Sequence, residues 1–422
     1  MTTPTSSFWE EIRGLERPIW IISGGVFLDR FGLFVVPFLV LFLTSHDVSK
    51  TLAGVAVGFV GLGSLIGSGL GGYLSDRLGR RKTMGLALFG AGAFSLSITA
   101  TAHWVIHGGP FALLLIAITA YGTCRGSYHA ASSSLVADLV PPTSRVAAFA
   151  VLRFAINLGF ALGMASAGFL AEFGFILLFV IDAVTSWFYA AISVTLLPPG
   201  RVSKKEECGW GIALRHIRTD HRFLRCSAAL FIMALIFVQW HSSFAVWLES
   251  SGYSTRVFGW IMALNGMLII LFEMPLSALT RRFAPPLVIG VGALLAGIGF
   301  ALIAWIPGIV GLVIAMTIFT LGEMIALPVQ AAYSITLAPQ DMRGRYNGVT
   351  GATWSLAGIT GPSAGLFFLG QGILVLCLGL AALGVIGFLI CLAGRAKDFP
   401  ENEDPDAQSC PTAAPEETTV AS

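Results

Sequence analysis

Charged side chains are scarce in this chain of 422 residues. Asp, Glu, Lys and Arg together make up 11% of it, whereas a soluble globular domain carries about 25%. Hydrophobic residues make up 55%, so most of the protein surface must face something other than water. The shortage of charge therefore excludes an ordinary soluble domain and indicates a protein embedded in a lipid bilayer.

Motifs for nucleotide-driven chemistry are also missing. The chain has no P-loop and no dinucleotide fingerprint, which argues against ATP-driven transport and against a nucleotide cofactor. Its six cysteines form no CxxC pair, so the sequence indicates neither a disulfide framework nor a metal site. We expect a protein that is not an enzyme, uses no cofactor or metal, and has no nucleic-acid partner.

The chain contains many long runs of apolar residues. A membrane-spanning helix needs about 20 apolar residues. Runs of this length cover residues 18–43, 52–74, 83–104, 111–138, 146–170, 174–197, 226–249, 257–279, 286–306, 309–337, 347–369 and 371–393. The sequence therefore predicts an all-α integral membrane protein with twelve transmembrane helices.

The longest connection divides these runs into two sets of six. Residues 198–225 open with two prolines and a glycine and then carry several Lys and Arg residues. We interpret this segment as a central cytoplasmic linker, with a short amphipathic helix at 209–219. It separates an N-terminal six-helix bundle at 18–197 from a C-terminal one at 226–393. Residues 394–422 are rich in Pro, Glu and Thr and are predicted to form a disordered cytoplasmic tail.

The orientation of the chain follows from its loop cations. Residues 1–17 mix acidic and basic side chains, and the apolar run after them is too long for the core of a cleavable signal peptide. If this N-terminal segment is cytoplasmic, the outside loops hold only Lys50 and Arg256, and the other loop cations lie inside. The positive-inside rule then places both termini in the cytoplasm. We expect the protein to lie in the cell (inner) membrane.

One cationic motif connects the second and third apolar runs. The run from Gly71 to Thr83 contains G-x-L-x-D-R-x-G-R-R-K. With this motif the chain resembles the major facilitator superfamily of transporters, most closely its proton-coupled drug-efflux branch, over about residues 18–393. The resemblance implies a charge latch at the cytoplasmic end of the second helix, near the start of the eleventh, that stabilises the outward-open state. Its residues are Gly72, Asp76, Arg77, Gly79, Arg80 and Arg81.

The two halves of the chain repeat each other. The loop at 77–82 corresponds to 279–283, and the loop at 140–145 corresponds to 338–343. Repeats of this kind place a substrate site near the middle of the membrane, between the halves. The resemblance implies that the first, fourth, seventh and tenth helices line this cavity, in a pair of pseudo-symmetric bundles.

Polar residues inside the apolar runs are the next sign of a site, because a charge buried in hydrocarbon is costly. From the starts of their runs, Asp29 lies ~16 Å and Arg125 ~21 Å into the membrane. Glu323 lies at a similar depth in the tenth run. Two other acids, Glu273 and Asp182, are interpreted as structural. The predicted cavity and substrate residues are Arg30, Arg125, Tyr121, Tyr128, Gln239, Trp240, Gln330 and Tyr333.

The predicted proton-coupling residues are Glu323, Asp29 and His241. Glu323 has no cation beside it in the sequence, and a buried carboxyl of this kind can exchange protons near neutral pH. We expect it to be the slower-releasing proton site, with Asp29 and Arg30 as its electrostatic counterpart. Structural roles are the alternatives. Arg30 or Arg125 could neutralise Asp29, Glu323 could be a hydrogen-bonded acid, and His241 could bond a neighbouring backbone group.

The fifth run contains glycines in the spacing of the antiporter motif of drug-exporting relatives. Gly159, Gly163 and Gly168 match that motif, whereas Met164 stands where it has proline. Small residues at this spacing let helices approach closely and could seal a leak path. Ordinary small-residue packing is the alternative. The fourth-helix motif of the family is not matched, because Arg125 directly precedes a glycine.

Together these features predict a secondary transporter that works by alternating access. Its predicted activity is proton-coupled export of amphipathic drugs or toxic metabolites. Proton-coupled uptake of a nutrient, a sugar or a small organic acid is one alternative, and a transport-inactive membrane receptor or scaffold is another. The expected partners are the lipid bilayer, protons and a small-molecule substrate, and the protein is expected to be a monomer.

Overall fold

The computed structural model describes residues 12–139, 145–199, 210–280, 282–339 and 342–394. The predicted N-terminal segment, linker and tail therefore lie largely outside the described residues. Within these ranges the regular elements are all helices. They are α2 (Arg17–Phe31), α3 (Val35–Thr44), α4 (Lys50–Leu78), α5 (Arg80–Ile106), α6 (Phe111–Leu139), α7 (Arg145–Leu170), η2 (Ala171–Phe173), α8 (Phe175–Leu196), α9 (Trp210–Thr219), α10 (His221–His241), α11 (Ser243–Ser250), α12 (Thr255–Thr280), α13 (Pro285–Trp305), α14 (Gly308–Leu337), α15 (Arg343–Gly370) and α16 (Ile373–Gly394).

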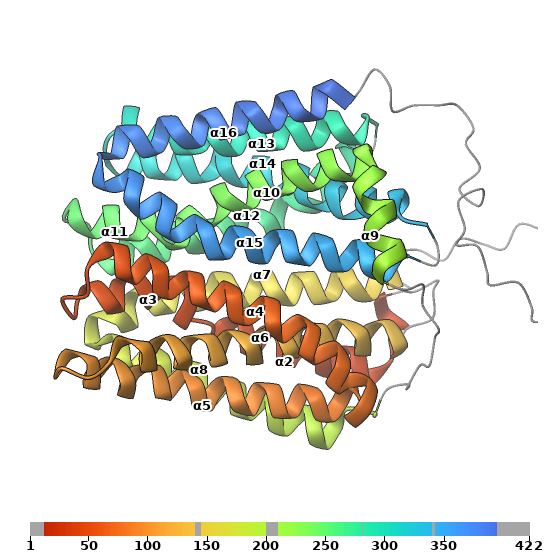
Figure 1. The fold of residues 1–422 in the computed structure, drawn as a ribbon, viewed down its shortest axis with the longest axis horizontal. Helices are drawn as coiled ribbons and strands as arrows, with labels where there is room; N and C mark the ends of the chain where they lie inside the picture. Colours follow the sequence, from red (N-terminus) through yellow and green to blue (C-terminus); the bar gives the residue numbers. More distant parts are fainter. Residues whose placement is uncertain (1–11, 140–144, 200–209, 281, 340–341, 395–422) are drawn as a thin grey trace, which may run out of the picture.

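The helices form two bundles that lie side by side (Figure 1). The first bundle contains α2 to α8, and the second contains α10 to α16. Between the bundles, α4 packs against α15 and α7 packs against α12. The short helix α9 lies at one end of the molecule, where it contacts α10 and α15.

In the described part of the chain, twelve helical segments are long enough to cross a bilayer. Ten of them are both long and apolar, and two of these ten combine a pair of helices, α2 with α3 and α10 with α11. The other two are α6 and α15, which are 29 and 28 residues long. They are less apolar because they carry polar side chains such as Arg125 and Asn347. The structure confirms the predicted all-α membrane fold.

The first predicted span, 18–43, is not one continuous helix. Residues 32–34 separate α2 from α3. Gly32 lies against α8 at this break, and a Cβ atom on it would come within 2.0 Å of the Thr185 hydroxyl oxygen. The break therefore allows α2 and α8 to approach closely, and it leaves Asp29 in the last turn of α2.

The linker is shorter than the predicted range 198–225. Its amphipathic helix is present as α9, close to the predicted bounds 209–219. The next helix begins at His221 rather than at residue 226. It begins there because Asp220 caps it, accepting a hydrogen bond from the backbone N–H of Phe223 at 2.9 Å. A side-chain cap of this kind satisfies a free N–H group at the start of a helix.

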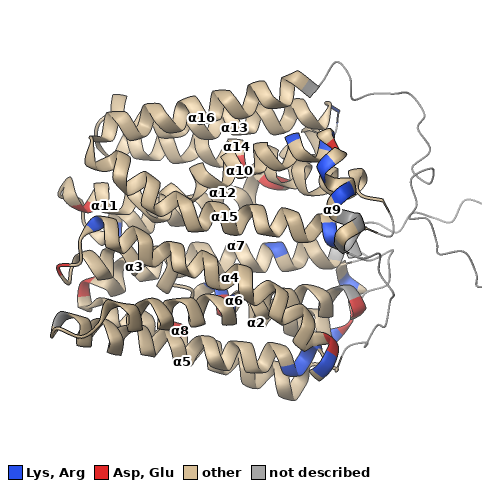
Figure 2. Cartoon of the chain, in the orientation of Figure 1, with Lys and Arg blue, Asp and Glu red and all other residues tan. Residues whose placement is uncertain are grey.

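Lys and Arg residues gather at one end of the molecule, which we call the basic end (Figure 2). The turn between α4 and α5 lies there, together with α9, and the exposed cations of these segments include Arg77, Arg215 and Arg218. The opposite end carries Lys50 and Arg256. The unequal charge of the two ends is the feature from which orientation in the membrane can be argued.

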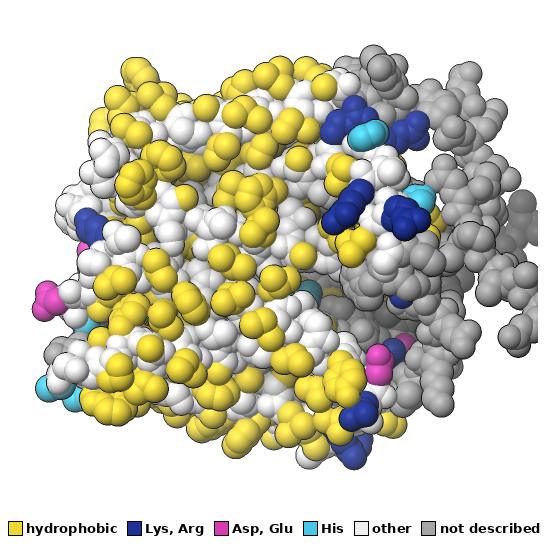
Figure 3. Space-filling model, viewed as in Figure 1, with side chains coloured by type: hydrophobic (Ala, Val, Ile, Leu, Met, Phe, Trp, Pro, Cys, Tyr) yellow, Lys and Arg dark blue, Asp and Glu magenta, His cyan; other side chains and the backbone are white. Residues whose placement is uncertain are grey.

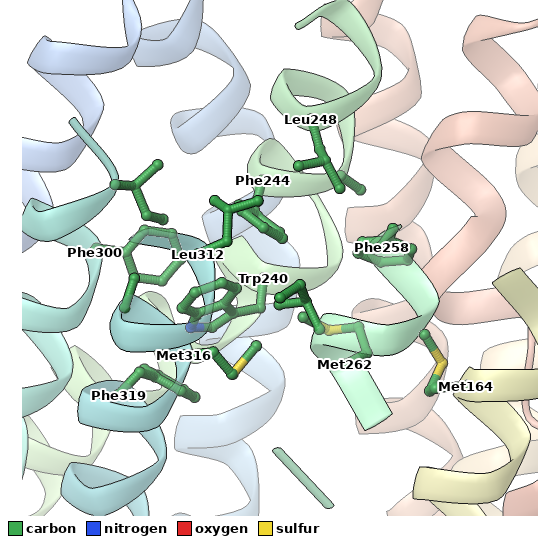
Figure 4. Packing of buried hydrophobic residues seen from close by; sticks show 14 of the residues in the cluster. Met164, Trp240, Phe244, Leu248, Phe258, Met262, Phe300, Leu312, Met316 and Phe319 are labelled. Carbon is green, nitrogen blue, oxygen red and sulfur yellow. The ribbon is translucent and has the colours of Figure 1, made fainter. Parts of the chain in front are cut away.

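A hydrophobic cluster closes the space between the bundles toward the end opposite the basic end. It contains Phe38 of α3, Met164 of α7, Phe244 of α11 and Phe258 of α12, the last three of which are labelled in Figure 4. The ring centroids of Phe38 and Phe258 are 5.3 Å apart. Aromatic and apolar contacts from both bundles therefore join them on this side.

The bundles separate at the basic end. The outer part of the first span, α3, contacts α10 and α11, whereas for the described residues α2 and α6 make no comparable contact with the second bundle. The space-filling view shows a recess between the bundles on this side (Figure 3). The structure is therefore a conformation that is closed at one end and open at the basic end.

Candidate functional site

Asp29 of α2 and Arg125 of α6 form a buried ion pair. Both carboxylate oxygens of Asp29 accept hydrogen bonds from Arg125, at 2.6 Å from Nη1 and 3.0 Å from Nη2. Asp29 is 1% exposed, and a two-pronged contact of this kind is among the strongest that a carboxylate makes. Arg125, and not the neighbouring Arg30, is therefore the cation that neutralises Asp29. A proton-coupling role for Asp29 stays a prediction.

Arg30 has no ion-pair partner among the described residues, and its Nε atom is buried without a hydrogen bond. It lies where α2 meets α7, because a Cβ atom on Gly159 would be 2.9 Å from the Cβ atom of Arg30. Arg30 was predicted to line the cavity, and that role stays a prediction.

His129 is a further polar residue near these charges, and it is not among the predicted site residues. It lies one helical turn beyond Arg125 on α6 and is exposed, although its charged neighbours Arg30, Arg125 and Asp29 lie inside the protein. An exposed side chain on the inward face of a helix lines a space that solvent can enter. The sequence feature that could have identified His129 is its spacing of four residues from Arg125, because this spacing places both side chains on one face of the helix.

Tyr121 and Tyr128 of α6 pack inside the first bundle. The Tyr121 hydroxyl donates a hydrogen bond to Asp182 of α8 at 3.3 Å. The ring of Tyr128 lies edge-on to that of Tyr189, with centroids 5.8 Å apart. The two predicted cavity tyrosines are 0% and 3% exposed, so in this conformation they lie behind the cavity wall. Tyr121 holds Asp182, and Tyr128 joins α6 to α8 through Tyr189.

Glu323 of α14 is the buried acid that the sequence places deep in the second bundle. It is 7% exposed and accepts a hydrogen bond from the Asn265 amide of α12 at 2.8 Å. Its charged neighbours are Arg153 of α7 and Glu273 of α12. Glu323 therefore has a cation near it in space, supplied by the other bundle, that its own stretch of sequence does not show.

Arg153 and Glu273 form an ion pair across the interface between the bundles. The Nε atom of Arg153 lies 2.6 Å from Oε1 of Glu273, and their side chains are 43% and 12% exposed. Arg153 is a basic residue inside an apolar run, and it is not among the predicted site residues. Glu273 was interpreted as structural, and its partner shows that it links α12 to α7. The pair brings both bundles to the neighbourhood of Glu323.

His241, at the end of α10, lies in an aromatic group that spans the two bundles. Its ring centroid is 6.0 Å from that of Phe160 on α7 and 5.4 Å from that of Phe237. The ring of Phe237 in turn lies 5.6 Å from that of Trp354 on α15. Among the described residues, Nδ1 of His241 is buried without a hydrogen-bond partner. The imidazole is therefore held by ring packing, while its Nδ1 atom has no hydrogen-bond partner among the described residues.

The other predicted cavity residues of the second bundle make packing contacts. Gln239 donates a hydrogen bond to the backbone of α15 at 3.0 Å, and Gln330 donates one to Ser334 at 2.9 Å. Trp240 is 2% exposed and belongs to the hydrophobic cluster described above. Tyr333 lines a small crevice beside Arg222 and Arg225. Contact between these four residues and a substrate stays a prediction that this conformation does not support.

The glycines of the antiporter-like motif hold helices close together. A Cβ atom on Gly159 or Gly163 would lie 2.5 Å or 2.4 Å from a backbone carbonyl oxygen of α2. A Cβ atom on Gly168 would lie 2.7 Å from a backbone oxygen of α12. Real atoms do not approach so closely, so α7 can pack here only because these residues are glycines. A role in sealing the transport path stays a prediction.

Gly163→Ala is expected to destabilise the protein, because the added methyl group has no room between α7 and α2. Overpacking of this kind costs about 1–3 kcal/mol, and the thermal unfolding temperature of the purified protein in detergent should fall. Gly69→Ala on α4 is the matched control, since nothing lies within 4 Å of its Cβ position. Equal unfolding temperatures for the two variants would show that the close contact is absent.

The cationic motif forms two helix ends rather than the expected loop. The helix α4 continues to Leu78, Gly79 reverses the chain with a φ of 85°, and α5 begins at Arg80. A positive φ is accessible to glycine because it has no Cβ atom. Arg80 pairs with Asp138 at the end of α6. The motif is therefore folded onto its own bundle.

The remaining latch residues lie at the basic end. Arg81 donates a hydrogen bond to the backbone carbonyl of Leu197, after α8, at 3.1 Å. Asp76 and Arg77 are exposed, and the Arg77 guanidinium lies 5.1 Å from the centre of the Tyr73 ring. For the described residues, no hydrogen bond or ion pair joins Asp76 to α15. The latch between the bundles stays a prediction for a conformation that is closed at this end.

Known proteins are similar in sequence to this chain over most of its length. The family model for the Major Facilitator Superfamily matches residues 19–362. The uncharacterized MFS-type transporter YqjV of Bacillus subtilis is 22% identical over 85% of the chain and 87% of its own length. The Na(+), Li(+), K(+)/H(+) antiporter of Planococcus maritimus is 24% identical over 81% and 87%. The multidrug resistance protein MdtH of Aeromonas salmonicida is 25% identical over 84% and 88%.

Solved transporter structures have the same fold. A peptide transporter POT in complex with sulfate has a TM-score of 0.75 at 16% identity, covering 93% of this chain and 99% of that one. A D-xylose–proton symporter has a TM-score of 0.72 at 18% identity, covering 91% and 97%. Sequence identities this low support a shared fold and nothing more specific. With the family model matching most of its length, the chain belongs to the Major Facilitator Superfamily and is a multi-pass membrane transporter.

Proposed function

We propose that the protein exports amphipathic small molecules in exchange for protons, and that Glu323 binds the proton. The observation that carries the proposal is the place of Glu323. It is a buried acid beside the Arg153–Glu273 ion pair, which joins the two bundles. Because Arg153 belongs to the first bundle and both acids belong to the second, the charge on Glu323 acts on the attraction between the bundles.

A proton on Glu323 changes this interface by one full charge. When Glu323 is ionised, Arg153 is attracted to two carboxylates of the second bundle, those of Glu273 and Glu323. When Glu323 is protonated, Arg153 is attracted to the carboxylate of Glu273 alone. A ligand shifts a conformational equilibrium only when it binds the two states with different affinity. The proton meets this condition if the distance between Arg153 and Glu323 changes as the bundles move. Proton binding at Glu323 would then drive alternating access.

Two other groups complete the proposed coupling. Asp29 and Arg125 supply a fixed pair of opposite charges in the first bundle. His241 lies at the junction of the bundles and has a nitrogen without a partner among the described residues. Imidazole can accept and pass on a proton near neutral pH, so we assign His241 a relay role.

The names of the relatives bear on the direction of transport. Relatives that are described as a multidrug resistance protein and as a cation/proton antiporter favour export. Uptake together with protons is the second candidate, because a D-xylose–proton symporter and a peptide transporter have the same fold. The sign of the response to a pH gradient separates the two.

The test uses a compound to which the protein confers resistance in a host that lacks its own efflux systems. The purified protein is placed in liposomes, and a pH gradient is imposed in each direction. An antiporter should accumulate the compound on the acidic side, since protons leave that side as the compound enters it. Accumulation on the alkaline side would establish uptake by symport, and transport that ignores both gradients would refute proton coupling.

The basic end is expected to face the cytoplasm, as the positive-inside rule requires. In intact cells, a thiol reagent that cannot cross membranes should label Lys50→Cys and Arg256→Cys at the opposite end. Arg215→Cys on α9, which is exposed at the basic end, should be labelled only after the cells are permeabilised. The unsubstituted protein gives the background from its native cysteines. Labelling of Arg215→Cys in sealed cells would reverse the orientation.

A further inference from the structure

Arg30 carries a charge for which the described part of the protein provides no counter-ion. Its Nε atom is buried and makes no hydrogen bond. Asp29 lies next to it in sequence but gives both carboxylate oxygens to Arg125. An unpaired charge at membrane depth destabilises a protein, so residues of this kind are generally kept for function.

The charges around Arg30 do not cancel. Asp29 and Arg125 neutralise each other, which leaves the guanidinium of Arg30 in excess. Arg30 is also a charged neighbour of His129, whose exposed ring adds one N–H donor to the same space. Asp182 is fully buried and bonded to Tyr121, so it lies behind the cavity wall. The first bundle therefore presents a positively charged surface to the cavity.

The acids of the second bundle are engaged elsewhere. Glu273 forms its ion pair with Arg153 on α7. Glu323 accepts its hydrogen bond from Asn265 on α12 and has Arg153 as its cationic neighbour. For the described residues, neither acid forms an ion pair or a hydrogen bond with Arg30 or His129. The charge of Arg30 is thus available to a molecule that enters from the open basic end.

Apolar surface lies next to this positive surface. Phe160 directly follows Gly159, the residue at which α7 meets Arg30. Its partly buried ring is 6.0 Å from His241, and the aromatic group continues to Phe237 and Trp354. A molecule that reaches Arg30 can therefore lay an apolar body against aromatic rings that both bundles supply.

We propose that Arg30 and His129 bind the anionic group of the transported molecule, so that the cargo is an amphipathic organic anion. The anionic group is a carboxylate, a sulfonate or a phosphate. The planar guanidinium of Arg30 offers two parallel donors to such a group, and His129 offers a third. The aromatic rings beside them hold the apolar body. The proposal rests on the transport function above and assigns its substrate class.

Binding measured without any gradient tests this assignment. Purified protein in detergent is titrated by calorimetry with naphthalene probes that share one apolar body. The anions are 2-naphthoate, 2-naphthalenesulfonate and 2-naphthyl phosphate, the neutral probe is 2-naphthamide, and the cation is 2-naphthylmethylammonium. At least one anion should bind about tenfold or more tightly than the neutral and cationic probes. Arg30→Gln should remove this preference, and His129→Ala should reduce it.

Three controls make the result decisive. Arg256→Gln removes an exposed cation at the opposite end and should keep the preference for anions. Arg30→Lys keeps the charge without the two parallel donors and should bind anions with intermediate affinity, and it carries the test if Arg30→Gln does not fold. Protein-free micelles correct for probe that enters the detergent. No binding of any probe, equal binding of all probes, or a preference that survives Arg30→Gln would overturn the proposal.

Thermal stability separates binding from a structural role for Arg30. Arg30→Gln removes a charge without a partner, so the protein without ligand should unfold at the same temperature or a higher one. A lower unfolding temperature together with unchanged anion binding would assign Arg30 to structure. Since no proton gradient is used, a failure of anion binding leaves the proton site at Glu323 standing. Loss of the proton site would likewise leave the anion site standing.

Discussion

Glu323→Gln is expected to abolish the accumulation of substrate driven by a pH gradient. Exchange of substrate down its own concentration gradient should persist. The glutamine side chain has nearly the same shape, and its carbonyl oxygen can still accept the hydrogen bond that Asn265 donates to Glu323 at 2.8 Å. It cannot bind and release a proton in the physiological range. The variant should therefore fold, bind and exchange, and lose only the coupling to protons.

Liposomes with an imposed pH gradient provide the measurement, and the variant should fall to the level of liposomes without protein. Glu249→Gln is the matched control, because Glu249 is an exposed acid on α11 and should leave accumulation unchanged. Asp29→Asn is less specific, since it leaves Arg125 as an unpaired buried charge, which costs about 3–5 kcal/mol. Full gradient-driven accumulation by both Glu323→Gln and Asp29→Asn would contradict the coupling scheme and leave His241 or Glu273 as carriers.

The fold was predictable because the membrane imposes a length on each helix. Apolar runs long enough to span a bilayer are visible in the sequence one by one, and the cationic motif indicates the family. The ends of helices were harder to predict, because they depend on contacts between distant residues. Gly32 breaks the first span against Thr185, and the cap from Asp220 starts α10 earlier than its apolar pattern does.

The burial of the acids was predictable, whereas the direction in which a side chain points was not. Counting residues placed Asp29 and Glu323 deep in their helices, and both are buried. The same counting assigned Trp240 and Tyr121 to the cavity, whereas both are buried, Trp240 against the rings of Phe244, Phe300 and Phe319 and Tyr121 against Asp182. In a soluble helix the polar face shows which side is exposed. Here lipid and protein interior are both apolar, so periodicity does not distinguish them.

The contacts that join the bundles were not visible in the sequence. Arg153 and Glu273 are far apart along the chain, and each lies alone in an apolar run. Asp29 has Arg30 beside it, yet its partner is Arg125 on another helix. Pairing of this kind depends on which helices meet at which level, and only the assembled structure provides that information.

Exchanging the charges of the pair that joins the bundles has the second large expected effect. Arg153→Glu places three acids near one another without a cation, and we expect substrate exchange to fall at least about tenfold, because repulsion between like charges opposes contact between α7 and α12. The double variant Arg153→Glu/Glu273→Arg restores an attractive pair and should recover most of the exchange. Both rates are measured in liposomes without a pH gradient, with equal amounts of folded protein.

The same double variant should not recover accumulation driven by a pH gradient. In the native protein, the cation near Glu323 belongs to the first bundle, so the charge on Glu323 acts across the interface. After the exchange, the arginine lies on α12 in the same bundle as Glu323, and the first bundle carries an acid instead. A proton on Glu323 then no longer weakens an attraction between bundles. Recovery of both exchange and gradient-driven accumulation would mean that the pair only holds the helices together and that protons act elsewhere.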